Sequence, residues 1–209
     1  MKTIIGSCVA ALMFLQISFA GTLTEDFNDG KMDGWTVLSG TWEVKNKELR
    51  QNQMGGPMVI VWDEPGELTD FTMTGKVMGL GGDADWGLAL RVTDRNNHYS
   101  WQYVNSNLMF VTYINGTRTE AWKTPQAEIL NEWQDFKVVA KGKTFELWWK
   151  GVKKNTFEHD ALKKGKVGLF GWETAEAFDD ITLTAEGVGK ATVFPKDKLA
   201  QIWGQIKSY

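Results

Sequence analysis

The sequence predicts an all-β protein: a two-sheet antiparallel jelly-roll sandwich followed by a short C-terminal amphipathic helix. Three observations predict it. Apolar and polar residues alternate in short runs, Gly, Asn and Asp separate those runs, and no sustained helical pattern occurs before residue 190. With 209 residues, of which 43% are hydrophobic, the chain is long enough to bury one core.

Two places show the strand and turn signals most clearly. Residues 71–77 place Phe71 and Met73 on one face of a strand, and polar residues stand between them. Asn115-Gly116 separates two apolar-rich runs, and both residues tolerate the positive φ that a tight hairpin turn needs. The repetition of such signals is typical of a sandwich or jelly roll.

The N-terminus has the features of a signal peptide covering residues 1–20. Lys2 supplies the positive start, an apolar stretch covers residues 4–15, and residues 18–20 (Ser-Phe-Ala) offer a cleavage site. A membrane anchor is the alternative, but polar residues interrupt the stretch. Cleavage would remove Cys8, the only cysteine, so we expect a secreted, periplasmic or cell-surface protein of bacterial type without disulfides or a transmembrane span.

The rest of the chain divides into a jelly-roll domain, residues 21–185, and a linker with a helical tail, residues 186–209. Pro195 can begin a helix. The apolar residues that follow at helical spacing are Leu199, Ile202, Trp203 and Ile206. This helix would pack back on the sandwich, or residues 195–209 would dock on a surface partner, or the end would fray.

The net charge of −3 and the pI near 5.5 give no basic surface for a nucleic-acid backbone. We therefore expect no DNA or RNA partner.

Several short motifs between residues 22 and 185 occur in an order that resembles the concanavalin A-like (laminin-G-like) jelly rolls. They include residues 26–30 (Asp-Phe-Asn-Asp-Gly), 87–91 (Gly-Leu-Ala-Leu-Arg), 133–138 (Trp-Gln-Asp-Phe-Lys-Val) and 178–181 (Phe-Asp-Asp-Ile). Carbohydrate-binding modules and 3-keto-disaccharide hydrolase-type domains are near relatives. The resemblance implies the fold and leaves open a lectin-like domain, a hydrolase or an adhesion domain.

Two departures from the enzymes of this superfamily disfavour catalysis. Family 16 glycoside hydrolases carry a Glu-x-Asp-x-Glu strand, whereas the nearest run here, Glu158-His159-Asp160, lacks the final carboxylate and is typical of a solvated loop. The 3-keto-disaccharide hydrolase type usually has Asn-Ser-Gly where this chain has residues 85–87 (Asp-Trp-Gly). We therefore assign no catalytic residue.

The central strand carries the first candidate for binding. Strand parity places Leu88 and Leu90 toward the core and Arg91, beside the small residues Gly87 and Ala89, on the opposite face. A depression with the N–H donors of an arginine guanidinium at its edge could bind sugar hydroxyls or a carboxylate. The alternative is an arginine paired with a neighbouring acid on an ordinary surface.

The next strand places Tyr99, Trp101 and Tyr103 on one face and His98 and Gln102 on the other. Polar side chains enter a core at a cost, so we expect the aromatics inside and His98 and Gln102 in the groove beside Arg91.

The strand at residues 144–149 carries the aromatic candidate. Phe145 and Leu147 take the core side, so Trp148 and Glu146 point outward. An exposed indole can stack on a pyranose, and the carboxylate can accept its hydroxyls. The alternative is that the C-terminal segment covers Trp148.

The resemblance also implies a structural calcium ion. Asp179 shares the parity of inward residues, where a bare carboxylate is costly, and relatives often hold calcium between their first and last strands. Asp26 and the carbonyl of Gly40 are the predicted partners. Backbone N–H groups that satisfy Asp179 are the alternative.

The leading expectation is thus a secreted carbohydrate-binding domain that holds a poly- or oligosaccharide on its concave sheet. A glycoside or 3-keto-disaccharide hydrolase and an adhesion or scaffold domain are the alternatives. The predicted ligand-binding residues are Arg91, His98, Gln102, Glu146 and Trp148.

Overall fold

The computed structural model describes residues 20–127 and 130–189, and within these ranges it describes every side chain except those of residues 82–84. Thirteen antiparallel strands and no helix occur in these ranges, so the all-β prediction is confirmed. The predicted signal peptide, apart from Ala20, and the predicted helix in residues 195–209 lie outside the described residues. None of the described residues form a helix with the length and apolarity needed to span a bilayer.

The strand bounds are as follows. They are β1 (Ala20–Glu25), β2 (Trp35–Ser39), β3 (Trp42–Lys45), β4 (Glu48–Gln51), β5 (Met58–Trp62), β6 (Phe71–Asp94), β7 (Asn97–Val104), β8 (Asn107–Ile114), β9 (Thr117–Pro125), β10 (Gln134–Lys141), β11 (Thr144–Trp149), β12 (Val152–Glu158) and β13 (Lys166–Glu186).

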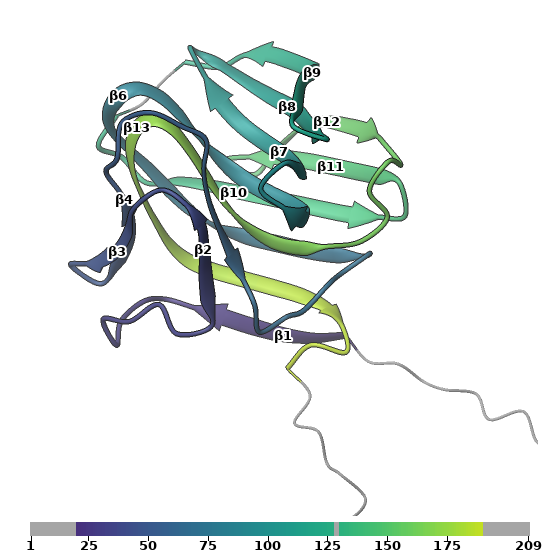
Figure 1. Ribbon diagram of the computed structural model, residues 1–209, viewed down its shortest axis with the longest axis horizontal. Helices are drawn as coiled ribbons and strands as arrows, with labels where there is room; N and C mark the ends of the chain where they lie inside the picture. The colour runs from purple at the N-terminus through teal and green to yellow at the C-terminus, as the bar shows by residue number, and fades with distance from the viewer. Residues whose placement is uncertain (1–19, 128–129, 190–209) are drawn as a thin grey trace, which may run out of the picture.

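Two long strands, β6 and β13, take part in both layers of the sandwich (Figure 1). Their pairing extends from Ala185 opposite Phe71 to Lys166 opposite Val92. Sheet I contains β1, the C-terminal half of β13, the N-terminal half of β6, and then β10, β11 and β12. Sheet II contains β2, β5, the other halves of β13 and β6, and then β7, β8 and β9. The two predicted sheets are therefore two ends of one continuous sheet.

The main core lies between sheets I and II and is rich in aromatic rings. Trp86 stacks on Tyr103 with ring centroids 5.3 Å apart and on Trp149 at 5.0 Å. Tyr99 and Trp101 are also buried, as the parity of β7 predicts. Such pairs contribute about 0.5–1.5 kcal/mol each beyond the area they bury.

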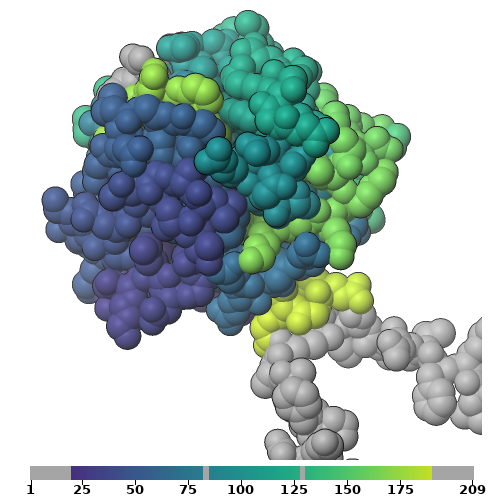
Figure 2. Space-filling model, in the orientation of Figure 1, coloured from purple at the N-terminus to yellow at the C-terminus, as the bar shows by residue number. Residues whose placement is uncertain are grey.

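A second cluster of buried side chains lies on the face of sheet II that is turned away from sheet I. It includes Val59 and Val61 of β5, Val111 of β8 and Phe170 of β13, and Leu38 of β2 packs against it. In the space-filling view the purple and blue N-terminal segments abut the teal segments of β7 and β8 (Figure 2). This face of sheet II is therefore covered by the chain's own side chains.

The hairpin predicted at Asn115-Gly116 connects β8 to β9. Their φ values are 52° and 78°, in the left-handed region that the turn requires. The sequence signal and the backbone conformation agree at this point.

Candidate functional site

Arg91 does not open onto the predicted groove, and that prediction is wrong. Its side chain is completely buried. The backbone of Arg91 has a φ of 50°, and the pairing of β6 with β7 and with β13 shifts register around it. The irregularity reverses the alternation, since Leu90 packs in the main core whereas Val92 joins the second cluster.

The buried guanidinium of Arg91 is held by backbone carbonyls. It donates to the oxygens of Leu162 and Thr69, each at 2.8 Å, and to the oxygen of Gly142. Its carbon lies 4.8 Å from the centre of the Phe145 ring. Burial lowers the pKa of Arg91 from its ordinary value, because desolvation disfavours the charged form. Arg91 therefore ties together three separate segments and is not available to a ligand.

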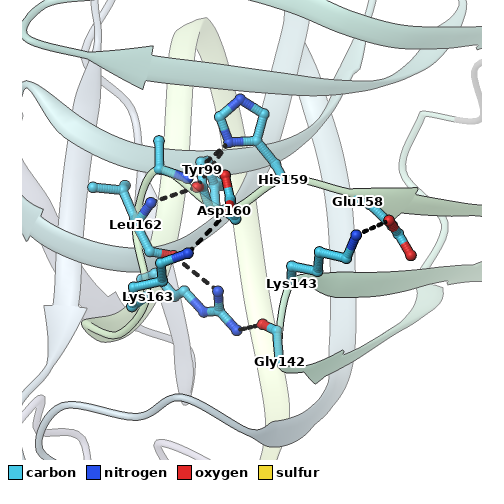
Figure 3. Close-up of polar contacts among 10 residues, drawn as sticks. Tyr99, Gly142, Lys143, Glu158, His159, Asp160, Leu162 and Lys163 are labelled. Carbon is cyan, nitrogen blue, oxygen red and sulfur yellow. Dashed lines mark hydrogen bonds and ion pairs between the residues drawn. The ribbon is translucent and has the colours of Figure 1, made fainter.

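Tyr99 makes a second tie to the same segment (Figure 3). Its hydroxyl accepts the amide of Leu162 at 2.6 Å and lies 2.9 Å from Nδ1 of His159. The ring of Tyr99 is completely buried, and this burial raises the pKa of its hydroxyl. The Tyr99–His159 pair is therefore a structural contact, with the phenol closed off from a substrate.

The carboxylates on either side of His159 are surface groups. Glu158 pairs with Lys143 at 2.7 Å, and Asp160 pairs with Lys163 at 3.0 Å (Figure 3). All four side chains are exposed, which agrees with the solvated loop expected for this run.

His98 and Gln102 lie on the expected face of sheet II, but neither reaches solvent. His98 is 0% exposed, and its ring stacks on Tyr113 with centroids 4.4 Å apart. Gln102 is 2% exposed and donates to the Tyr113 hydroxyl at 3.3 Å. Burial lowers the pKa of His98 to about 4, so the imidazole is neutral near pH 7. The centre of this face therefore offers no open groove for a glycan.

Trp148 and Glu146 lie on the outer face of sheet I, as the parity of β11 predicts. Both are half-buried. Trp148 borders a depression of about 430 Å³, which we call the Trp148 depression. Its lining residues are Thr74, Gly75, Lys76, Asp135, Phe136, Lys137, Trp148, Gly151 and Asp180.

Two lysines lie near the indole of Trp148. The ammonium of Lys137, directly opposite on β10, lies 4.9 Å from the ring centre, and that of Lys153 on β12 lies at 5.8 Å. Glu146 accepts the indole N–H at 3.3 Å and the Lys153 ammonium at 2.6 Å. The hydrogen bond from Lys153 is the main cause that lowers the pKa of Glu146. Glu146 is therefore a hydrogen-bond acceptor and not a proton donor near pH 7.

The other side of the Trp148 depression carries a second ion pair. Asp180 has a φ of 50° where β13 shifts register against β6, and its carboxylate accepts the Lys76 ammonium at 2.6 Å. This bond raises the pKa of Lys76. Thr74 lies opposite Lys137, so hydroxyl, ammonium and indole groups form one row across three strands.

Sequence reasoning missed Lys76, Lys137 and Asp180 as members of this site. A signal existed for Lys137, because the turn around Gly142 makes β10 and β11 a hairpin and sets Lys137 beside Trp148. Asp180 gave no such signal, since its orientation depends on the irregularity in β13.

The predicted calcium ligands Asp26 and Asp179 each accept a neighbouring backbone amide. Asp26 is exposed and accepts the amide of Asn28 at 3.1 Å, whereas Asp179 accepts the amide of Asp180 at 2.7 Å. Burial raises the pKa of Asp179. Within residues 20–127 and 130–189, no three His, Cys, Asp or Glu side chains converge. The calcium ion stays a prediction, which thermal melting in the presence of calcium and of a chelator would test.

Comparison with known protein families gives one match that covers most of the chain. The model of the 3-keto-alpha-glucoside-1,2-lyase-like domain matches residues 22–184. No curated protein matches the sequence significantly.

Several solved structures share the fold. The carbohydrate-binding module CBM66 from Bacillus subtilis superposes with a TM-score of 0.69 at 20% identity, covering 74% of this chain and 97% of the module. A laminarinase from Flavobacterium sp. UMI-01 gives 0.60 at 10% identity, with 78% and 99% covered. A non-specific endo-beta-1,3(4)-glucanase from family GH16 gives 0.61 at 8% identity, with 80% and 91% covered. At these identities the likeness concerns the fold alone.

Proposed function

Because the chain belongs to the family of 3-keto-alpha-glucoside-1,2-lyase-like domains, we propose that it binds a carbohydrate in the Trp148 depression. The family name and the carbohydrate-binding module and glucanases of similar fold support a saccharide as the ligand class. Fold alone does not specify function, so the site has to carry the argument.

The observation that carries the proposal is the combination of groups around Trp148. An indole can stack on the apolar C–H face of a pyranose, while Asp180 accepts and Lys137 donates hydrogen bonds to its hydroxyls. Glu146 lies beside the depression and accepts the indole N–H. The volume of about 430 Å³ falls in the range typical of small-ligand sites. The buried face of sheet II offers no comparable access.

Binding without turnover fits the acids near Trp148. Most glycoside hydrolases use one carboxyl group that stays protonated as the general acid. Lys153 lowers the pKa of Glu146, and Lys76 pairs with Asp180 at 2.6 Å. Each of these two carboxylates pairs with a lysine, which supports binding rather than hydrolysis.

The test is calorimetric titration with neutral oligosaccharides selected on a glycan array. Trp148→Ala should weaken binding about tenfold or more, because the stacking surface is removed. Trp133→Ala is the matched control, since Trp133 is 36% exposed and does not line the depression. Equal binding by wild type and Trp148→Ala would refute the proposed site.

The family match itself favours a second candidate function, cleavage of a 3-keto-α-glucoside. Incubation with such a substrate and measurement of the released sugar tests it. Turnover that survives repurification would support an enzyme, and its absence would leave binding as the function. Secretion and a surface partner for residues 195–209 stay predictions.

A further inference from the structure

A second depression, of about 330 Å³, forms where three segments distant in the sequence meet. They are the turn at Ser39 and Gly40 after β2, residues 53–58 around the start of β5, and the β6–β7 turn at Arg95 and Asn96. We call it the Arg95 depression. It shares no lining residue with the Trp148 depression.

Hydrogen bonds hold the walls of the Arg95 depression together. Ser39 Oγ donates to the carbonyl of Pro57 at 2.8 Å and accepts the amide of Val59 at 3.1 Å. The amide of Glu173 donates to the carbonyl of Gly55 at 3.2 Å. Residues 53–58 are therefore fixed to β2 and to β13 without a ligand.

Two glycines in the wall of the depression pack closely on neighbouring side chains. A Cβ on Gly40 would lie 2.3 Å from Cγ of Met58, and one on Gly56 would lie 2.7 Å from Cγ of Trp172. Neither position has room for a side chain. Their backbones therefore pack directly on these neighbours and line the wall.

Two side chains that line the depression, Arg95 and Gln53, have donors without an acceptor among the described residues. Arg95 is its only charged lining residue, and the guanidinium makes no hydrogen bond or ion pair with any described residue. The side-chain oxygen of Gln53 accepts the Thr41 hydroxyl at 3.0 Å, and its side-chain nitrogen makes no hydrogen bond with any described residue. Exposed donors without an acceptor fit a ligand that brings its own negative oxygens.

We propose that the Arg95 depression binds the carboxylate of an acidic saccharide, such as a uronic acid residue. The planar guanidinium matches the two oxygens of a carboxylate, and Gln53 and Asn96 can bind the adjacent hydroxyls. That the carboxylate belongs to a saccharide rests on the proposed function. The site itself is independent of Trp148.

The test compares galacturonate oligosaccharides with their methyl esters, which differ only in charge. The acid should bind wild-type protein, and the ester should bind about tenfold more weakly or worse. Arg95→Gln should lower the affinity for the acid by a similar factor. The affinity of Arg95→Lys should lie between those of wild type and Arg95→Gln, because lysine keeps the charge but lacks the planar pair of N–H donors. Added salt should weaken binding of the acid.

Controls separate this proposal from the previous one. Lys45→Gln removes one exposed positive charge outside both depressions and should bind the acid like wild type. Trp148→Ala should still bind the acid more tightly than the ester, even if it no longer binds neutral glycans. The proposal is overturned if the acid does not bind, if the ester binds equally well, or if Arg95→Gln binds the acid like wild type.

Discussion

The guanidinium carbon of Arg91 lies 4.8 Å from the centre of the Phe145 ring, and both side chains are completely buried. No described residue forms an ion pair with this arginine. Three backbone carbonyls and an aromatic face stabilise the charge in place of a carboxylate. Arg91 is therefore a structural residue that fixes the turns at one end of the sandwich.

Replacing Arg91 by Leu should lower the free energy of unfolding by about 3–5 kcal/mol. The carbonyls of Leu162, Thr69 and Gly142 would each lose their donor, and a buried unpaired group costs about 1–3 kcal/mol. Urea unfolding followed by tryptophan fluorescence measures the change.

Arg118→Leu is the control for that experiment. Arg118 pairs with Glu120 at 3.0 Å near the surface, where such a pair contributes about 1 kcal/mol or less. If the two variants unfold at the same urea concentration, Arg91 does not stabilise the fold through its hydrogen bonds to the three carbonyls.

The strands and the core were predictable because their signals are local. Alternation assigns Tyr99, Trp101 and Leu90 to the interior wherever a strand pairs without interruption, and Asn115-Gly116 specifies its own turn. These features need no knowledge of distant segments.

Arg91 was misplaced because parity counting fails at an irregularity. Residues 90–93 contain no Gly or Pro that would mark one, so nothing local indicates the register shift. The closed face of sheet II was unpredictable for a different reason. Leu38, Val59 and Val111 lie on three different strands and meet in one cluster only in the folded sheet, which pairwise patterns do not specify.

Tyr99→Phe should destabilise the protein by about 1–2 kcal/mol and loosen the segment after β12. The change removes the hydroxyl that accepts the amide of Leu162 and contacts His159 while keeping the ring. Amide hydrogen exchange gives the local readout: the Leu162 amide should exchange faster, whereas the amides of β7 should not. Unchanged exchange at Leu162 would show that the hydroxyl does not hold this segment.

His98 should make the protein less stable as the pH falls. The pKa of His98 is lowered from 6.5 to about 4 by burial, so below pH 6.5 the unfolded chain takes up a proton that the folded chain does not. The stability present above pH 6.5 is lost progressively toward pH 4, by about 3 kcal/mol in full.

His98→Phe should remove this loss, because the ring stack on Tyr113 stays and the titrating group is gone. Urea midpoints at pH 7 and pH 4.5 measure it: the drop between them should shrink in the variant. His159→Phe, at the half-buried imidazole, is the matched control. A pH dependence unaltered by His98→Phe would contradict the prediction.

Glu176 should have the opposite effect on the pH dependence. Its side chain is completely buried, and neither carboxyl oxygen has a hydrogen-bond partner among the described residues, so desolvation raises its pKa well above the ordinary value. The folded state keeps the carboxyl protonated while the unfolded chain ionises it. Stability is therefore complete below the ordinary pKa and is lost as the pH rises toward the folded-state value.

Glu176→Gln should accordingly raise the melting temperature at pH 8 and change it little at pH 4, where the glutamate is neutral in both states. The amide has the same shape as the protonated acid and never ionises, so the destabilising ionisation disappears. Glu186→Gln is the control, because Glu186 is an exposed acid at the end of the same strand. If Glu176→Gln melts at a lower temperature than wild type at pH 8, the carboxyl is ionised and bound in the folded protein, and the inference from its burial fails.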